Sequence, residues 1–95
     1  MRLTLTPALR RAAMRCLWFK PPEEAIQSPN ELAAHILTYG LLPDFDALRE
    51  QLGDDDLRAA LDNAPPGIFD ARSWAYWNLM VGRHETPPMP ARRFE

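Results

Sequence analysis

Proline is the residue that most constrains how this chain can fold. The 95 residues contain ten prolines and only four glycines, and no Asn-Gly or Asp-Gly pair occurs. Those pairs form the tight corners of β-hairpins, whereas a proline begins or stops a helix. The sequence therefore predicts an all-α fold, a compact bundle of about five short helices separated by stiff turns.

Capping residues indicate where each helix begins. A Ser, Thr or Asp directly before an apolar periodic run is typical of a helix N-terminus, and glycine or proline follows many C-termini. On these signals the predicted helices are Pro7 to Leu17 after Thr6, Pro29 to Tyr39 after Ser28, one capped by Asp44 that ends at about Leu52, one capped by Asp54 that extends to Ala64, and Ala71 to Val81 after Asp70. A single helical turn is also expected over residues 22–26.

Three further predictions concern the second predicted helix. Ser28 and Glu31 have the spacing of a capping box. Gly40 is expected to supply the left-handed residue that ends many helices. The core contribution of this helix and the following turn is expected from Leu32, Ala33, Ile36, Leu37, Tyr39, Leu41 and Leu42.

The last predicted helix has apolar residues on nearly every side. These are Trp74, Ala75, Tyr76, Trp77, Leu79, Met80 and Val81. Such a helix lies at the centre of its bundle or contacts a partner. In a protein this small we expect the central position, and an exposed aromatic contact face is the alternative. Trp18 and Phe19 are expected to cap the bundle.

The composition fits one domain followed by a tail. At 46% apolar and 25% charged residues, positions 1–83 are predicted to form a single helical domain, and 84–95 an extended tail rich in proline and arginine. No apolar run approaches the roughly 20 residues of a membrane span. Because the single cysteine has no partner within the chain and no secretion leader is recognisable, we expect a cytoplasmic location without membrane binding.

Charge is strongly segregated along the chain. Residues 1–20 hold five cations and no acid, whereas residues 21–70 hold eleven acids and two cations. We expect the basic start to fold against the acidic middle, so that the two fields largely cancel. The alternative is nucleic-acid binding by a basic strip of Arg10, Arg11 and Arg15. The net charge of −2 disfavours that alternative.

Groupings typical of catalysis were sought and not recognised in the sequence. Glu31 and His35 are interpreted as a structural or solvated pair, since a metal site needs further converging ligands. Cys16 lies on the apolar side of its helix, where a thiol is normally inert. Residues 54–56 lack the spacing of a calcium loop. We therefore expect a chain that is not an enzyme, with no catalytic residue, cofactor or metal.

Several segments resemble one known group of proteins. They are Trp18-Phe19-Lys20 with its Pro-Glu-Glu turn, His35 to Gly40, Asp44 to Gly53, and Ala64 to Trp77, which reads APPGIFDARSWAYW. Over roughly residues 17–82 the chain resembles small helical bacterial proteins of unknown function encoded beside nucleotidyltransferase-fold toxins of the AbiEii type. The resemblance implies an antitoxin-like or accessory partner of such a toxin, and it carries over no catalytic residue.

The functional prediction is a non-enzymatic protein-binding module. Trp, Tyr and Arg are enriched at the hot spots of protein interfaces. The predicted contacts are therefore Arg72, Trp74, Tyr76, Trp77, Arg92, Arg93 and Phe94. A homodimer formed through the aromatic helix is a further alternative.

Overall fold

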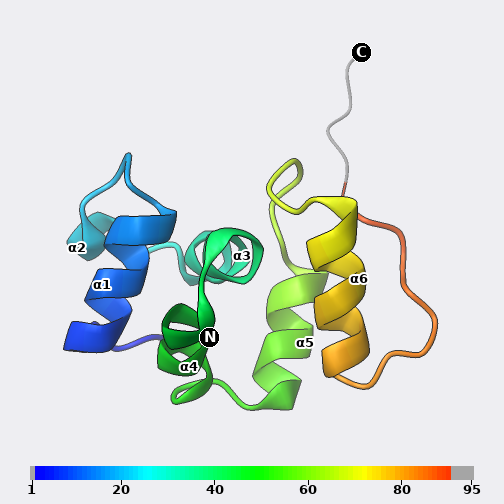
Figure 1. The fold of residues 1–95 in the computed structure, drawn as a ribbon. Helices are drawn as coiled ribbons and strands as arrows, with labels where there is room; N and C mark the ends of the chain where they lie inside the picture. Colours follow the sequence, from blue (N-terminus) through cyan, green and yellow to red (C-terminus); the bar gives the residue numbers. More distant parts are fainter. Residues whose placement is uncertain (1, 91–95) are drawn as a thin grey trace.

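The fold is all-α. The computed structural model describes residues 2–90, and within this range it contains six helices and no strand (Figure 1). The helices are α1 (Pro7–Cys16), α2 (Pro22–Ala25), α3 (Pro29–Tyr39), α4 (Leu42–Arg49), α5 (Asp54–Asp62) and α6 (Ala71–Met80). The predicted bundle of short helices is confirmed, and the helical turn expected over 22–26 is the sixth helix, α2.

Helix α3 lies at the centre of the bundle. It packs against α1, α2 and α4 and also against α5 and α6, which lie on the other side of it in Figure 1. Its buried residues are Leu32, Ala33, Ala34, Ile36 and Leu37. The prediction that 71–81 would be the central helix is therefore wrong, because only Trp74, Trp77 and Asn78 of α6 are buried.

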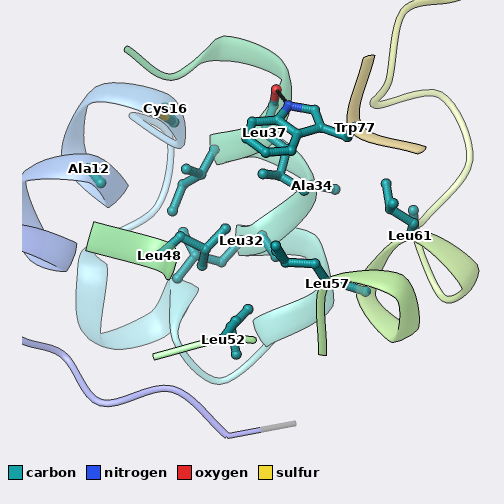
Figure 2. Packing of buried hydrophobic residues seen from close by; sticks show 14 of the residues in the cluster. Ala12, Cys16, Leu32, Ala34, Leu37, Leu48, Leu52, Leu57, Leu61 and Trp77 are labelled. Atoms are coloured by element: carbon teal, nitrogen blue, oxygen red, sulfur yellow. Dashed lines mark hydrogen bonds between the residues drawn. The ribbon is translucent and has the colours of Figure 1, made fainter. Parts of the chain in front are cut away.

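One continuous apolar core joins all six helices. Figure 2 shows Leu32 of α3 between Leu48 of α4 and Leu57 of α5, with Trp77 of α6 beside Leu37. The same cluster extends from Leu3 near the N-terminus to Val81 after α6. All buried side-chain nitrogen and oxygen atoms in the described residues have a hydrogen-bond partner, so the polar groups inside the core are satisfied.

Two of the predicted helix caps are confirmed. The Thr6 hydroxyl accepts from the Leu9 amide at 3.1 Å, and the Asp70 carboxylate accepts from the Ser73 amide at 2.7 Å. Ser28 makes no side-chain cap bond, and the Glu31 carboxylate binds Lys20 instead, so the predicted capping box is wrong.

Helices α4 and α5 use a different capping arrangement from the predicted one. Leu41 and Gly53 occupy the N-cap positions. The acid at the third helical position reaches back, so that Asp44 accepts from the Leu41 amide at 2.9 Å and Asp56 from the Gly53 amide at 3.3 Å. The prediction of Asp44 and Asp54 as N-caps is therefore wrong, because a carboxylate can satisfy the first amides from inside the helix.

Several residues expected in the core are exposed. Tyr39 and Leu41 are each 59% exposed and Leu42 is 75% exposed. Trp18 and Phe19, which were expected to cap the bundle, are 80% and 54% exposed. The buried face of α3 is formed by the five residues named above, and Tyr39 lies outside it. Gly40 adopts an extended conformation with φ of −75°, so the expected left-handed residue is also wrong.

The basic start folds against the acidic middle, as predicted. Three ion pairs join the two regions, from Arg10 to Glu23, from Arg15 to Asp44 at 3.1 Å and from Lys20 to Glu31 at 2.7 Å. Two of these acids lie on α2 and α3, and the third, Asp44, lies in the first turn of α4. The charges of the N-terminal region are thus largely compensated within the fold.

The segment after α6 returns along that helix. Residues 84–90 contain no helix, and the Trp74 indole Nε1 donates to the Pro87 carbonyl at 2.8 Å, which holds the segment against α6 (Figure 1). Arg92, Arg93 and Phe94 lie outside the described residues, so the predicted tail is described only as far as Pro90. Among the described helices, none combines the length and apolarity needed to cross a bilayer.

Candidate protein-binding groove

A groove opens between α3, α4 and α6. Its volume is about 220 Å³. The lining residues are Leu37 and Thr38 of α3, Phe45 of α4, and Arg72, Ser73, Tyr76 and Trp77 of α6. We call this site the α6 groove. Three of its lining residues, Arg72, Tyr76 and Trp77, are among the predicted contacts.

The floor of the α6 groove is apolar and fixed in position. The Trp77 indole Nε1 donates to the Leu37 carbonyl at 2.7 Å, and that carbonyl lies in the last turn of α3, where no backbone amide is available to it. The ring of Phe45 meets the Trp77 ring edge-to-face at a centroid distance of 5.0 Å. Figure 2 shows Trp77 lying over Leu37. The floor is therefore formed before any ligand arrives.

The rim of the α6 groove is amphipathic and accessible. Tyr76 is 52% exposed and meets Trp77 edge-to-face at 5.1 Å. Arg72 is exposed in the first turn of α6 and forms no ion pair within residues 2–90. Thr38 uses its hydroxyl to donate to the Ala34 carbonyl at 2.8 Å. The rim thus offers a guanidinium and a phenol beside an apolar floor.

Trp74 has a different environment from the other predicted contacts. It is only 4% exposed, its ring meets Phe69 at 5.3 Å, and its indole nitrogen binds the Pro87 carbonyl. Its side chain holds the segment 84–90 against α6 and does not line the groove. Arg92, Arg93 and Phe94 lie outside the described residues, so their predicted contact role stays a prediction.

The predicted basic strip is only partly free. Arg10 pairs with Glu23 and Arg15 with Asp44. Arg11 is exposed and has no ion-pair partner among the described residues. Two of the three arginines are thus partly neutralised by neighbouring carboxylates, which weakens the attraction of this face for a phosphate backbone.

Groups with catalytic potential are engaged in structural contacts. His35 Nδ1 lies 2.9 Å from the Glu31 carbonyl, while the Glu31 carboxylate binds Lys20. In the part of the chain that the structure describes, no cluster of three or more His, Cys, Asp or Glu residues could hold a metal ion. The predicted absence of an enzymatic function stays a prediction.

Cys16 is buried next to an acid. Burial is the main cause that raises the pKa of its thiol from 9.0 to about 11, and the Asp44 carboxylate adds to this rise, while Arg15 opposes it. The sulfur lies 3.9 Å from Asp44 Oδ2. Because the thiolate is the nucleophile, a thiol with this pKa is inert at neutral pH.

A second exposed apolar region was missed by the sequence analysis. Trp18, Phe19, His35 and Tyr39 form a chain of aromatic rings with successive centroid distances of 5.8, 5.7 and 6.0 Å. We call them the aromatic cluster. A pocket of about 360 Å³ adjoins it and is lined by Met14, Trp18, Phe19, Lys20, Pro21 and Pro22. The pocket lies at the α1–α2 turn and shares no lining residue with the α6 groove, and the aromatic cluster extends from this turn to His35 and Tyr39 of α3.

Comparison of the chain with models of protein families, with curated proteins and with solved structures gave no match. The resemblance to proteins encoded beside AbiEii-type toxins therefore stays a prediction, and the functional argument depends on the surfaces described above.

Proposed function

We propose that this chain is a non-enzymatic protein-binding module that acts as an antitoxin-like or accessory partner of a nucleotidyltransferase-fold toxin. The observation that carries the proposal is the α6 groove. It combines an apolar floor with an exposed arginine and tyrosine, which are residue types that dominate interface energies.

The groove is suited to hold one apolar side chain of a partner. Its floor is fixed by the bond between Trp77 and Leu37, so little ordering is required when a partner binds. A leucine or phenylalanine on the partner would fill the space above Phe45 and Trp77. A neighbouring carboxylate would then pair with Arg72, which has no ion-pair partner among the described residues.

The charge distribution also suits a nucleotidyltransferase. Such an active site gathers acids around metal ions and cations around phosphates. The first turn of α5 presents Asp54, Asp55 and Asp56, all exposed. Asp54 pairs with Arg49 and Asp55 with Arg58, so the three carboxylates exceed their two partners by one negative charge, which complements a phosphate-binding surface. Complementary charge would steer the partner and fix its orientation.

The test is binding to the toxin encoded by the adjacent gene. The tagged chain and this toxin are co-expressed, and the dissociation constant of the purified complex is measured by calorimetry. We expect Tyr76→Ala and Arg72→Ala each to weaken the complex by about tenfold or more, as is usual for hot-spot residues. Leu79→Ala is the matched control, because Leu79 is 60% exposed on the same helix and does not line the groove.

Two outcomes would contradict the proposal. One is the failure of the toxin to bind the folded chain. The other is a complex whose affinity is unchanged by both groove variants while circular dichroism shows that they fold. Light scattering of the chain alone tests the homodimer alternative, for which α6 offers the exposed residues Leu79 and Met80 beside Tyr76.

A further inference from the structure

The aromatic cluster is exposed although the core beneath it is complete. Trp18 is 80% exposed, Phe19 54% and Tyr39 59%, and Met14 on α1 is also 59% exposed. Single exposed apolar residues are common on protein surfaces, but adjoining ones around a pocket indicate an interaction site. Trp18, Phe19 and Met14 line the same pocket of about 360 Å³.

The turn that carries Trp18 and Phe19 is fixed in place. Lys20 Nζ donates to Glu31 Oε1 of α3 at 2.7 Å, and the Phe19 ring meets His35 of α3 at 5.7 Å. Pro21 and Pro22 follow directly and restrict the backbone. The backbone that carries Trp18 is thus held in place, which lowers the entropy cost of binding through this turn.

We propose that the pocket beside the aromatic cluster is a second protein-binding site, and that it takes an acidic amphipathic helix of another protein. An apolar side chain of that helix lies against Trp18 and Met14, and carboxylates one turn away pair with the arginines of α1. This site is independent of the α6 groove, because α1 and α2 lie on the opposite side of α3 from α6 (Figure 1).

The acidic character of the bound helix follows from the charges around the pocket. Arg11, Met14 and Arg15 lie three or four residues apart on α1, so they share one exposed face. Arg11 has no ion-pair partner among the described residues, and the Arg15 side chain is 46% exposed although it is paired with Asp44. Carboxylates at helical spacing on the bound segment would face these two guanidinium groups.

The charges on the other side of the pocket argue against a nucleic acid. Glu23 and Glu24 lie on α2, and Glu23 is paired with Arg10. These acids would repel a phosphate backbone that follows the pocket, because its charge is continuous along its length. An amphipathic helix avoids this conflict, because it can turn its carboxylates toward α1 and its uncharged side toward α2.

The experiment is a selection from a displayed library of helical peptides of about 15 residues, a length that can form a stable helix. The immobilised full chain serves as bait, and one enriched peptide is then titrated while Trp18 fluorescence is followed. This signal is suitable because the other two tryptophans, Trp74 and Trp77, are buried. We expect enriched peptides to combine Leu or Phe with Asp or Glu three or four residues away.

Variants assign the binding to this pocket. By calorimetry, we expect Trp18→Ala and Arg11→Glu each to weaken the peptide by about tenfold or more, and added salt to weaken it further. Both residues are exposed, so the variants should keep the fold, which circular dichroism checks. Tyr76→Ala in the α6 groove is the matched control and should leave the affinity unchanged.

Several results would overturn the proposal. These are enriched peptides that are basic or uncharged, or an affinity that Trp18→Ala does not change. Tighter binding of a single-stranded oligothymidine that competes with the peptide would assign the surface to nucleic acid. Self-association that Trp18→Ala abolishes would assign it to a second copy of the chain. None of these results depends on the toxin, so this test and that of the α6 groove can fail separately.

Discussion

At the residue scale, Asp44 shows how one buried acid connects two helices. It is 2% exposed and accepts from the Leu41 amide at 2.9 Å and from Arg15 Nη1 at 3.1 Å. The carboxylate therefore caps α4 and also holds it against the last turn of α1. Sequence analysis assigned Asp44 to a helix N-terminus, which is nearly the observed place. The bond to Arg15 could not be predicted, because 29 residues separate the two positions.

Because the pKa of Cys16 is raised, the free energy of unfolding depends on pH in the alkaline range. The folded thiol has a pKa of about 11 against 9.0 ordinarily, so between these values the unfolded chain loses a proton that the folded chain keeps. The contribution is fully present below pH 9.0 and is lost as the pH rises through about 11. We expect the free energy of unfolding to fall by at most about 3 kcal/mol from this group.

Urea titrations of the wild type and of Cys16→Ala across this pH range measure the effect. Lys20 also has a raised pKa, caused mainly by its hydrogen bond to Glu31, but it is present in both proteins and cancels in the comparison. The stability difference between the two proteins should therefore shrink as the pH rises. Parallel curves for the two proteins would show that the Cys16 ionisation is not linked to folding.

At the element scale, the residue at which a helix begins was easier to predict than the way the helix packs against its neighbours. α1, α3 and α6 begin at the predicted residues, since Pro7, Pro29 and the Asp70 cap are local signals. α4 has its N-cap at Leu41, three residues before the predicted cap Asp44, because its capping acid acts from the third helical position. Contacts between distant segments determine which side of each helix faces α3. For α6 the periodicity of apolar residues could not indicate that side, because such residues occur nearly all around the helix.

Gly40 joins α3 to α4 through a close approach that only glycine permits. A Cβ atom at this position would lie 2.5 Å from the Ile36 carbonyl oxygen and 3.1 Å from Phe45 Cε1. We expect Gly40→Ala to lower the free energy of unfolding by about 1–3 kcal/mol, the usual cost of overpacking. Urea denaturation followed by circular dichroism measures the change.

Gly53 provides the matched control for this substitution. It also lies at a helix boundary, its φ is −77°, and a Cβ atom there would meet nothing within 4 Å. Gly53→Ala should therefore cost less than about 1 kcal/mol, the typical penalty for alanine at an N-cap. Equal losses for the two variants would refute a steric role of Gly40.

At the scale of the whole molecule, the candidate site was predicted in part. Arg72, Tyr76 and Trp77 line one groove, as expected for contacts on one helix. The sequence analysis did not predict the aromatic cluster, although one residue of the sequence indicated an exposed apolar surface nearby. Met14 lies on the arginine face of α1, opposite the buried stripe, and an apolar residue on a polar face indicates a contact surface. The exposure of Trp18 could not be predicted, because it depends on how the α1–α2 turn packs on α3.

The single core predicts cooperative unfolding of the whole domain. Leu9 of α1 and Trp77 of α6 belong to the same apolar cluster, which is continuous through α3. We expect one urea transition, with coincident midpoints for tryptophan fluorescence and for far-ultraviolet circular dichroism. The fluorescence change reports mainly on α6, since Trp74 and Trp77 are buried and Trp18 is already exposed. A fluorescence transition at lower urea would show that α5 and α6 unfold separately.

The central position of α3 has a consequence for synthesis on the ribosome. α1 and α2 leave the exit tunnel before α3 and α4. Until these follow, the apolar face of α1, with Leu9, Ala12, Ala13 and Cys16, can pack only against the short helix α2. A nascent chain that ends before Tyr39 thus exposes the stripe that the finished protein buries, and such surfaces are what chaperones bind. A delay in the emergence of residues 29–49 would prolong this stage, whereas rapid delivery of α3 and α4 would end it.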